Sequence, residues 1–114
     1  MEIVRAGIGL TRLAQLAEGL FGDLVKAVVD SERGIMASDA ELHADEAALL
    51  LDDGSRQEDV WGVNPYPADV ETAGFLEFDS MINVRPRQGN RSRSVEDPTI
   101  QARISAIVDG LVRR

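Results

Sequence analysis

Acidic side chains and the chain's single histidine fall on two predicted strands, residues 35–43 and 74–85. Side chains alternate between the two faces of a strand, so every second residue of each segment shares one face. The candidates for a cluster on one sheet face are Asp39, Glu41, His43, Glu77 and Asp79. Clustered carboxylates raise one another's pKa values or bind a divalent cation, and a histidine beside them could act as a general base.

The same polar face also has an ordinary structural explanation. Antiparallel sheets commonly leave one face in water, where charged residues on neighbouring strands form ion pairs. The sequence contains no Asp-x-Asp-x-Asp-Gly calcium loop and no His-Glu-x-x-His zinc motif. It contains no cysteine and one histidine, which excludes thiolate zinc sites and sites built from several histidines. A cation site and a solvated surface both remain open.

A second candidate site is a loop rich in arginine, residues 85–93. Four arginines and no acidic residue fall within these nine positions of a chain whose net charge is −8. An arginine fork binds phosphate or carboxylate through two hydrogen bonds, and glycine or asparagine in a turn lets backbone N–H groups face an anion. The residues predicted to bind an anion are Asn83, Arg85, Arg87, Asn90, Arg91 and Arg93. The alternative is that these arginines pair with the protein's own carboxylates.

The composition limits both the number of domains and the classes of partner. A chain of 114 residues can bury one hydrophobic core without disulfide bonds, so we expect a single domain over residues 1–114. The acidic net charge disfavours nucleic acid and anionic membranes as partners. No apolar run is long enough to cross a membrane and no signal peptide is visible, which predicts a cytoplasmic protein.

Two amphipathic helices are predicted, one toward each end of the sequence. Residues 12–21 follow Thr11, a good N-cap residue, and carry leucines at helical spacing. Asp97 and Pro98 form a typical helix start, and the isoleucines that follow recur at helical spacing up to the end of the sequence. Each helix therefore has one apolar stripe that must pack against another element.

Strands are predicted over residues 2–5, 24–30, 35–43, 58–64 and 74–85. Residues 45–51 allow two interpretations. The Asp53-Gly54 pair between apolar runs favours a hairpin with a strand at 47–51, whereas alanine and leucine favour a short helix. With the preferred hairpin, the fold is α+β: a largely antiparallel meander of about five strands with both helices packed on one face. The other face would remain polar and would carry the candidate residues.

Motifs spread over most of the chain resemble those of a small prokaryotic family of uncharacterised proteins. They are ELHADEAALLL at 41–51, then DGS, QED, WG and YP between 53 and 67, and EFDSMINVRP and QGNRSR between 77 and 93. The resemblance implies a bacterial or archaeal cytoplasmic protein of similar length. It implies no activity, cofactor or catalytic residue. Pro65 departs from the pattern where a strand residue is expected, which leaves the end of that strand open.

Three functional hypotheses follow from these features. The leading one is a non-catalytic binding or regulatory module, without a cofactor, that recognises an anionic small molecule or an acidic protein surface through the loop 85–93. The alternative enzyme is a small metal-dependent hydrolase on the polar sheet face, with a divalent cation as its cofactor. The third is a structural domain that forms a homodimer by pairing an exposed edge strand with a second copy.

Overall fold

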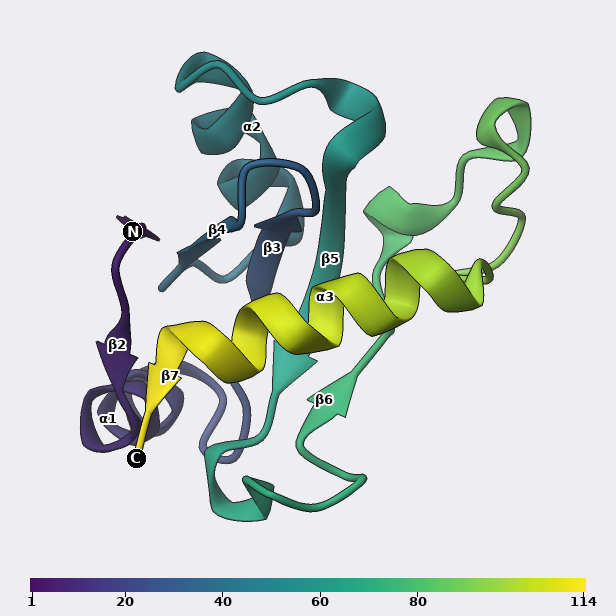
Figure 1. The fold of residues 1–114 in the computed structure, drawn as a ribbon. Helices are drawn as coiled ribbons and strands as arrows, with labels where there is room; N and C mark the ends of the chain where they lie inside the picture. Colours follow the sequence, from purple (N-terminus) through teal and green to yellow (C-terminus); the bar gives the residue numbers. More distant parts are fainter.

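The computed structural model describes all 114 residues, which form three α-helices and two sheets (Figure 1). The main sheet has the strand order β1-β4-β3-β5-β6, and all neighbouring strands in it are antiparallel. Its strands are β1 (Glu2–Val4), β3 (Ala27–Asp30), β4 (Ile35–Ser38), β5 (Val60–Pro65) and β6 (Leu76–Glu77). The second sheet is a parallel pair of β2 (Ile8–Gly9) and β7 (Val112–Arg113). The predicted α+β class with an antiparallel sheet is confirmed.

The strand β3 occupies the centre of the main sheet. It forms a hairpin with β4, and the Asp30 carboxylate holds the turn by accepting hydrogen bonds from the N–H groups of Glu32 and Arg33, each at 2.9 Å. After β4 the chain crosses the sheet, and β5 pairs with the other side of β3. The order is therefore not a simple meander, and all four residues of β3 are buried.

Two helices pack on one face of this sheet. They are α1 (Leu10–Leu20) and α3 (Pro98–Leu111), and α3 runs across the strands β3 and β5 in Figure 1. Leu13 of α1 and Ile104 of α3 are fully buried in the larger hydrophobic core, together with Met36 of the sheet. Both helices cover the same face, as predicted. None of the three helices combines the length and apolar composition needed to cross a membrane.

The opposite face of the sheet is partly covered by a third helix, α2 (His43–Asp52). Ala47 and Leu50 of α2 pack against Val28 and Val60 in a second, smaller core. The prediction that helices shield one side of the sheet alone is therefore wrong. The candidate polar face exists only where α2 does not reach.

The hairpin predicted around 47–51 is also wrong, and the helical alternative is correct. The Asp53-Gly54 pair ends α2 instead of turning a hairpin. The N–H of Asp53 donates to the carbonyl of Leu49 at 3.1 Å, and Gly54 takes a positive φ of 107°, which suits glycine after a helix. The apolar residues of α2 become buried on one side only, which is what a helix on a sheet requires.

Two predicted strands end early. β4 stops at Ser38 because Asp39 adopts a left-handed conformation with a φ of 70°, so residues 39–43 turn away into α2. The predicted strand 74–85 retains only β6. After β6, Ser80 accepts a hydrogen bond from the N–H of Ile82 and begins a 3₁₀ turn over Met81–Asn83. Alternation therefore does not describe the directions of the side chains at residues 39–43 and 78–85, where the strands have already ended.

Side chains that follow β6 complete the outer edge of β5. β5 pairs with β6 only over its last two residues. Farther along, the amide of Asn83 accepts a hydrogen bond from the N–H of Gly62 and donates one to its carbonyl, both at 2.9 Å. Arg85 donates to the carbonyl of Val60 at 2.7 Å. Because buried backbone groups must be hydrogen-bonded, these two side chains take the place of a neighbouring strand.

One carboxyl group of α2 is buried without an ion pair. Glu46 is fully buried, and one of its oxygens accepts a hydrogen bond from the N–H of Ala40 at 3.2 Å. The other oxygen has no hydrogen-bond partner. Burial disfavours the charged form and raises the pKa of Glu46 to about 9. The folded protein therefore holds this side chain in its neutral, protonated form at neutral pH.

Replacing Glu46 with glutamine should remove a loss of stability that develops as the pH rises from 4.5 to about 9. The pKa of Glu46 is raised in the folded protein, so only the unfolded chain releases this proton as the pH rises past the ordinary value of 4.5. Stability should therefore fall between pH 4.5 and about pH 9, by at most about 1.4 kcal/mol per pH unit. Glu46→Gln should lack this fall in urea unfolding, and Glu41→Gln, at an exposed site, should retain it. Identical pH profiles for both variants would contradict the protonated state.

Candidate functional site

A cavity of about 360 Å³ opens on the α2 side of the sheet, beside the N-terminal end of that helix. The sheet supplies its floor: Lys26 precedes β3, Asn64 lies near the end of β5, and Glu77 pairs with Asn64 from β6. His43 of α2 and Ser80, from the segment that follows β6, line the wall. The volume is in the range of sites that bind small molecules.

Gly62 allows the two wall residues to lie directly against the sheet. A Cβ atom at this position would lie 2.5 Å from Ser80 Oγ and 3.2 Å from His43 Cγ. Both distances are shorter than an ordinary van der Waals contact, so any side chain here would displace Ser80 or His43. The missing side chain of one β5 residue thus makes room for the polar wall of the cavity.

His43 is buried and favours its neutral form. Its Nε2 lies 2.9 Å from the carbonyl oxygen of Val63, so the tautomer that satisfies this carbonyl donates from Nε2 and leaves Nδ1 as an acceptor. Burial lowers the pKa of His43, and the nearby charge of Lys26 lowers it further, against the opposing effect of the hydrogen bond to Val63. At neutral pH the imidazole is therefore an uncharged part of the wall.

Asn64 joins the elements that form the floor. Its amide nitrogen donates to Glu77 Oε1 at 2.9 Å and to the carbonyl of Asp79 at 3.0 Å. Its Oδ1 is buried and has no hydrogen-bond partner. An unpaired buried oxygen of this kind costs about 1–3 kcal/mol. The nitrogen of the Asn64 amide therefore holds the floor together, while its oxygen stays without a hydrogen bond.

Two cationic side chains line the cavity, and they differ in their pairing. Arg93 donates from Nε to Asp79 Oδ1 at 2.5 Å. Lys26 is the only lysine of the chain and forms no ion pair, and its ammonium lies 5.2 Å from the centre of the Phe21 ring. An ammonium without a counter-ion, in a chain of net charge −8, is available to an anionic ligand.

The N-terminal end of α2 faces the same cavity. No side chain caps this helix at Leu42, and its first two residues, His43 and Ala44, line the cavity. Unpaired N–H groups and the helix dipole make such an end attractive to anions. Asp45 in the first turn offsets part of this attraction, whereas Glu46 is neutral.

The five residues predicted to bind a cation do not form one cluster. His43, Glu77 and Asp79 meet at the cavity, whereas Asp39 lies 3.5 Å from the chain's amino group and Glu41 is exposed. No group of three or more acidic or histidine side chains is arranged to hold a metal ion. The physical reason is the turn at Asp39, which ends β4 before the predicted alternation can continue.

Three of the residues predicted to bind an anion hold the fold together instead. The amide of Asn83 is bonded to Gly62, and Asn90 donates to the carbonyl of Asn83 at 2.7 Å. The guanidinium of Arg85 lies over the ring of Trp61, 3.9 Å from its centre. These side chains are already bonded within the protein and are not free for a ligand.

The backbone of the predicted anion-binding loop already binds a carboxylate of the protein. The N–H groups of Arg91 and Ser92 donate to Glu96 Oε2 at 2.8 and 2.7 Å, and the hydrogen bonds from Ser92 and Arg91 lower the pKa of Glu96. The side chains of Arg87 and Arg91 are exposed and unpaired. Of the four loop arginines, Arg93 is the one that reaches the cavity on the α2 side.

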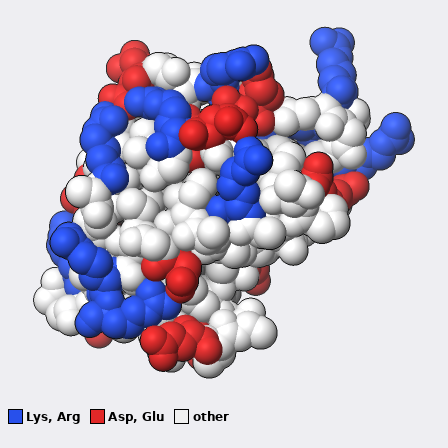
Figure 2. All heavy atoms as spheres, in the orientation of Figure 1, with Lys and Arg blue, Asp and Glu red and all other residues white.

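Charges of both signs are spread over the face of the molecule that α3 covers. Figure 2 shows acidic groups beside most of the basic ones on the face that α3 covers. Several of these neighbours are ion pairs between exposed side chains, such as Arg103 with Glu32 at 2.7 Å. Exposed ion pairs of this kind contribute little to stability.

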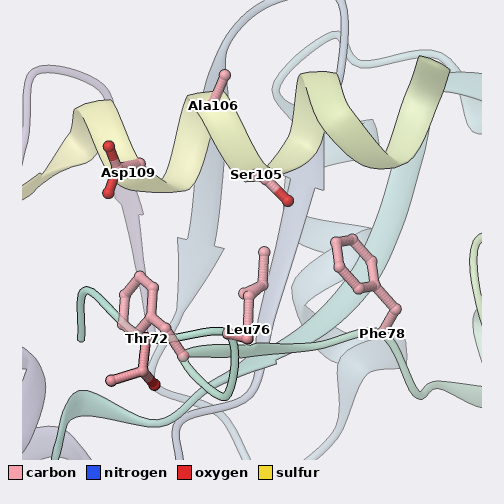
Figure 3. A pocket seen from close by; sticks show the side chains of 8 residues that line it. Thr72, Leu76, Phe78, Ser105, Ala106 and Asp109 are labelled. Carbon is pink, nitrogen blue, oxygen red and sulfur yellow. The ribbon is translucent and has the colours of Figure 1, made fainter. Parts of the chain in front are cut away.

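A second cavity, of about 420 Å³, lies between α3 and the segment that contains β6 (Figure 3). Leu76 and Phe78 face Ser105 of α3 across it. Its one charged side chain, Asp109, is ion-paired with Arg114 at 2.6 Å. Five of its eight lining residues are hydrophobic, and it has no cationic side chain that could hold an anion.

Three further polar residues line the α2-side cavity, Lys26, Asn64 and Ser80, and the sequence offers a signal for two of them. Alternation in the strand predicted at 24–30 places Lys26 on the face opposite Ala27, and it is the only lysine of the chain. Alternation in the strand predicted at 58–64 likewise places Asn64 on the same face as Val60, whereas the position of Ser80 depends on the early end of β6 and on the space above Gly62. Neither feature can be read from a local pattern.

Gly62→Ala should destabilise the protein by about 1–3 kcal/mol, because the added methyl group would overlap Ser80. Gly19→Ala is the matched control: it lies within α1, and an added methyl group there meets no atom within 4 Å. This control should stabilise the protein by about 0.5–1 kcal/mol, the gain expected for alanine in a helix. Urea unfolding measures the change in the free energy of unfolding for both variants. If Gly62→Ala leaves this free energy unchanged, the wall residues are not in tight contact with β5.

Comparison with known proteins identifies a family but no activity. No curated protein and no solved structure matches the chain. A family model described as "Protein of unknown function (DUF5674)" matches residues 2–111, which is nearly the whole sequence. The match agrees with the resemblance to uncharacterised proteins that the sequence motifs indicate. The chain therefore belongs to the DUF5674 family.

Proposed function

We propose that this protein is a binding module for a small anionic molecule, held in the α2-side cavity. The observation that carries the proposal is the unpaired ammonium of Lys26, which lines the same cavity as the uncapped N-terminal end of α2. A lysine and a helix N-terminus attract the same kind of group, a carboxylate or a phosphate. An anionic metabolite of this kind would be met in the cytoplasm, the location that the sequence predicts.

Two carboxylates, Glu77 and Asp79, line the cavity, and hydrogen bonds to other residues reduce their repulsion of an anion. Asp79 is paired with Arg93, and Glu77 accepts a hydrogen bond from Asn64. Arg93 uses only its Nε in the ion pair with Asp79, so the outer N–H groups of its fork can donate to a ligand. Hydrogen bonds to charged groups contribute about 1.5–3 kcal/mol each. Two of them would give a simple anion a dissociation constant on the order of millimolar.

This proposal keeps the anionic ligand predicted from the sequence and moves its site. The loop 85–93 contributes Arg93, and its other polar groups are bonded within the protein or point into solvent. A cation-dependent hydrolase has less support, because the acids at the cavity do not form a group that could hold a metal ion. Pairing of two copies through a sheet edge would have to use β1 or β6, which are three and two residues long.

Lys26→Gln and Arg93→Gln should each weaken the binding of inorganic phosphate by about tenfold or more, the effect of losing one charge-assisted hydrogen bond. NMR titration would follow the backbone signals of His43 and Ala44, which line the cavity. Arg87→Gln is the matched control, since it removes an equally cationic loop residue that lines no cavity, and its affinity should be unchanged.

Two results would overturn this assignment. In the first, phosphate, sulfate and acetate all fail to move the signals of residues that line the cavity. In the second, binding is lost in Arg87→Gln and kept in Lys26→Gln, which would place the anion on the exposed loop.

A further inference from the structure

Three large apolar side chains surround the entrance of the α2-side cavity. Phe21, Leu42 and Met81 are 39%, 55% and 66% exposed, and all three line the cavity. They come from three separate segments: the C-terminal end of α1, the N-cap position of α2, and the 3₁₀ turn after β6. Single exposed apolar residues are common, but convergence of three around one cavity is typical of a binding site.

The apolar rim and the cationic group are in direct contact. The ammonium of Lys26 lies 5.2 Å from the centre of the Phe21 ring, so the charge and the apolar surface border the same space. Leu24 and Ile82, both partly buried, continue the apolar lining inward. A fully hydrated ion such as phosphate would leave this lining exposed to water.

Building on the proposed function, we infer that the ligand is an amphipathic organic acid. Its carboxylate or phosphate group binds at Lys26 and the N-terminal end of α2, and its apolar body packs against the side chains of Leu42 and Met81. Small-molecule sites usually combine a few polar anchors with a larger apolar lining, and this cavity has both. The structure thus narrows the ligand class from anions in general to acids that carry an alkyl or aromatic group.

A series of straight-chain carboxylates tests this inference. From acetate to butyrate and hexanoate, the affinity of the native protein should rise about two- to fourfold for each added methylene group. Hexanol, which has the apolar chain without the acid, should bind more weakly than hexanoate. Affinities would be measured by NMR titration at a concentration of each acid where it does not self-associate.

Variants of the rim locate the effect. Met81→Gln and Leu42→Ala, at exposed positions where folding is not at risk, should flatten the dependence on chain length, lowering the affinity for hexanoate far more than that for acetate. Leu51→Gln is the matched control: this leucine of α2 is 37% exposed, lies outside the cavity, and its replacement should have no effect.

The outcomes separate the inference from the proposed function. If acetate and phosphate bind but chain length has no effect, the amphipathic ligand is refuted and the anion site stands. If none of the acids binds, both fail. If longer acids bind more tightly in every variant, including Lys26→Gln, their apolar part lies elsewhere, with the apolar cavity beneath α3 as the alternative place, and the inference is wrong.

Discussion

One amide side chain connects the sheet to the candidate site. Asn83 bonds both backbone groups of Gly62, and it also donates to the carbonyl of Arg93 at 3.0 Å. The same residue therefore completes the edge of β5 and fixes the segment that carries the cavity's arginine. Asn83 is fully buried, so its amide has no water to replace these partners, and losing it would leave unpaired groups on both sides. Ser80 is fixed at the same place, because its N–H donates to the carbonyl of Arg93 at 3.0 Å and its carbonyl accepts from the N–H of Asn83 at 3.1 Å.

The cavity exists because α2 covers only part of its face of the sheet. Beneath the helix, that face is apolar, with Val28 and Val60 in the smaller core. Lys26 comes two residues before Val28, and Asn64 comes four residues after Val60. Alternation therefore places both on this same face of the sheet. One face of the sheet thus has an apolar half, which α2 covers, and a polar half, which lines the cavity. The N-terminal end of α2 lies at the boundary between them, which is why it adjoins the polar half.

The sequence predicts those parts of the fold whose signals are local, and misses those decided by packing. The two terminal helices and the central strands were predictable, because a cap at Asp97 and runs of buried valine act over a few residues. Asp53-Gly54 suits both a hairpin turn and a helix end, and only the burial of Leu50 against the sheet decides between them. Of the candidate residues, His43, Glu77, Asp79 and Arg93 meet at the cavity. Asn83 could not be recognised as structural, since no pattern shows a side chain acting as a strand.

The parallel pair of β2 and β7 constrains the order in which the molecule can assemble. Ile8 pairs with Val112, and Gly7 fits closely beneath Arg113, where a Cβ atom would lie 2.9 Å from its Nε. The contact between β2 and β7 can form only after residues 112–113 have been synthesised. The hairpin of β3 and β4, with α2 and β5, involves much nearer neighbours and can form earlier. Since β7 also packs against α1, the cover over the apolar stripe of α1 stays incomplete during translation until residues 112–113 have been made, and aggregation or chaperone capture can compete with folding until then.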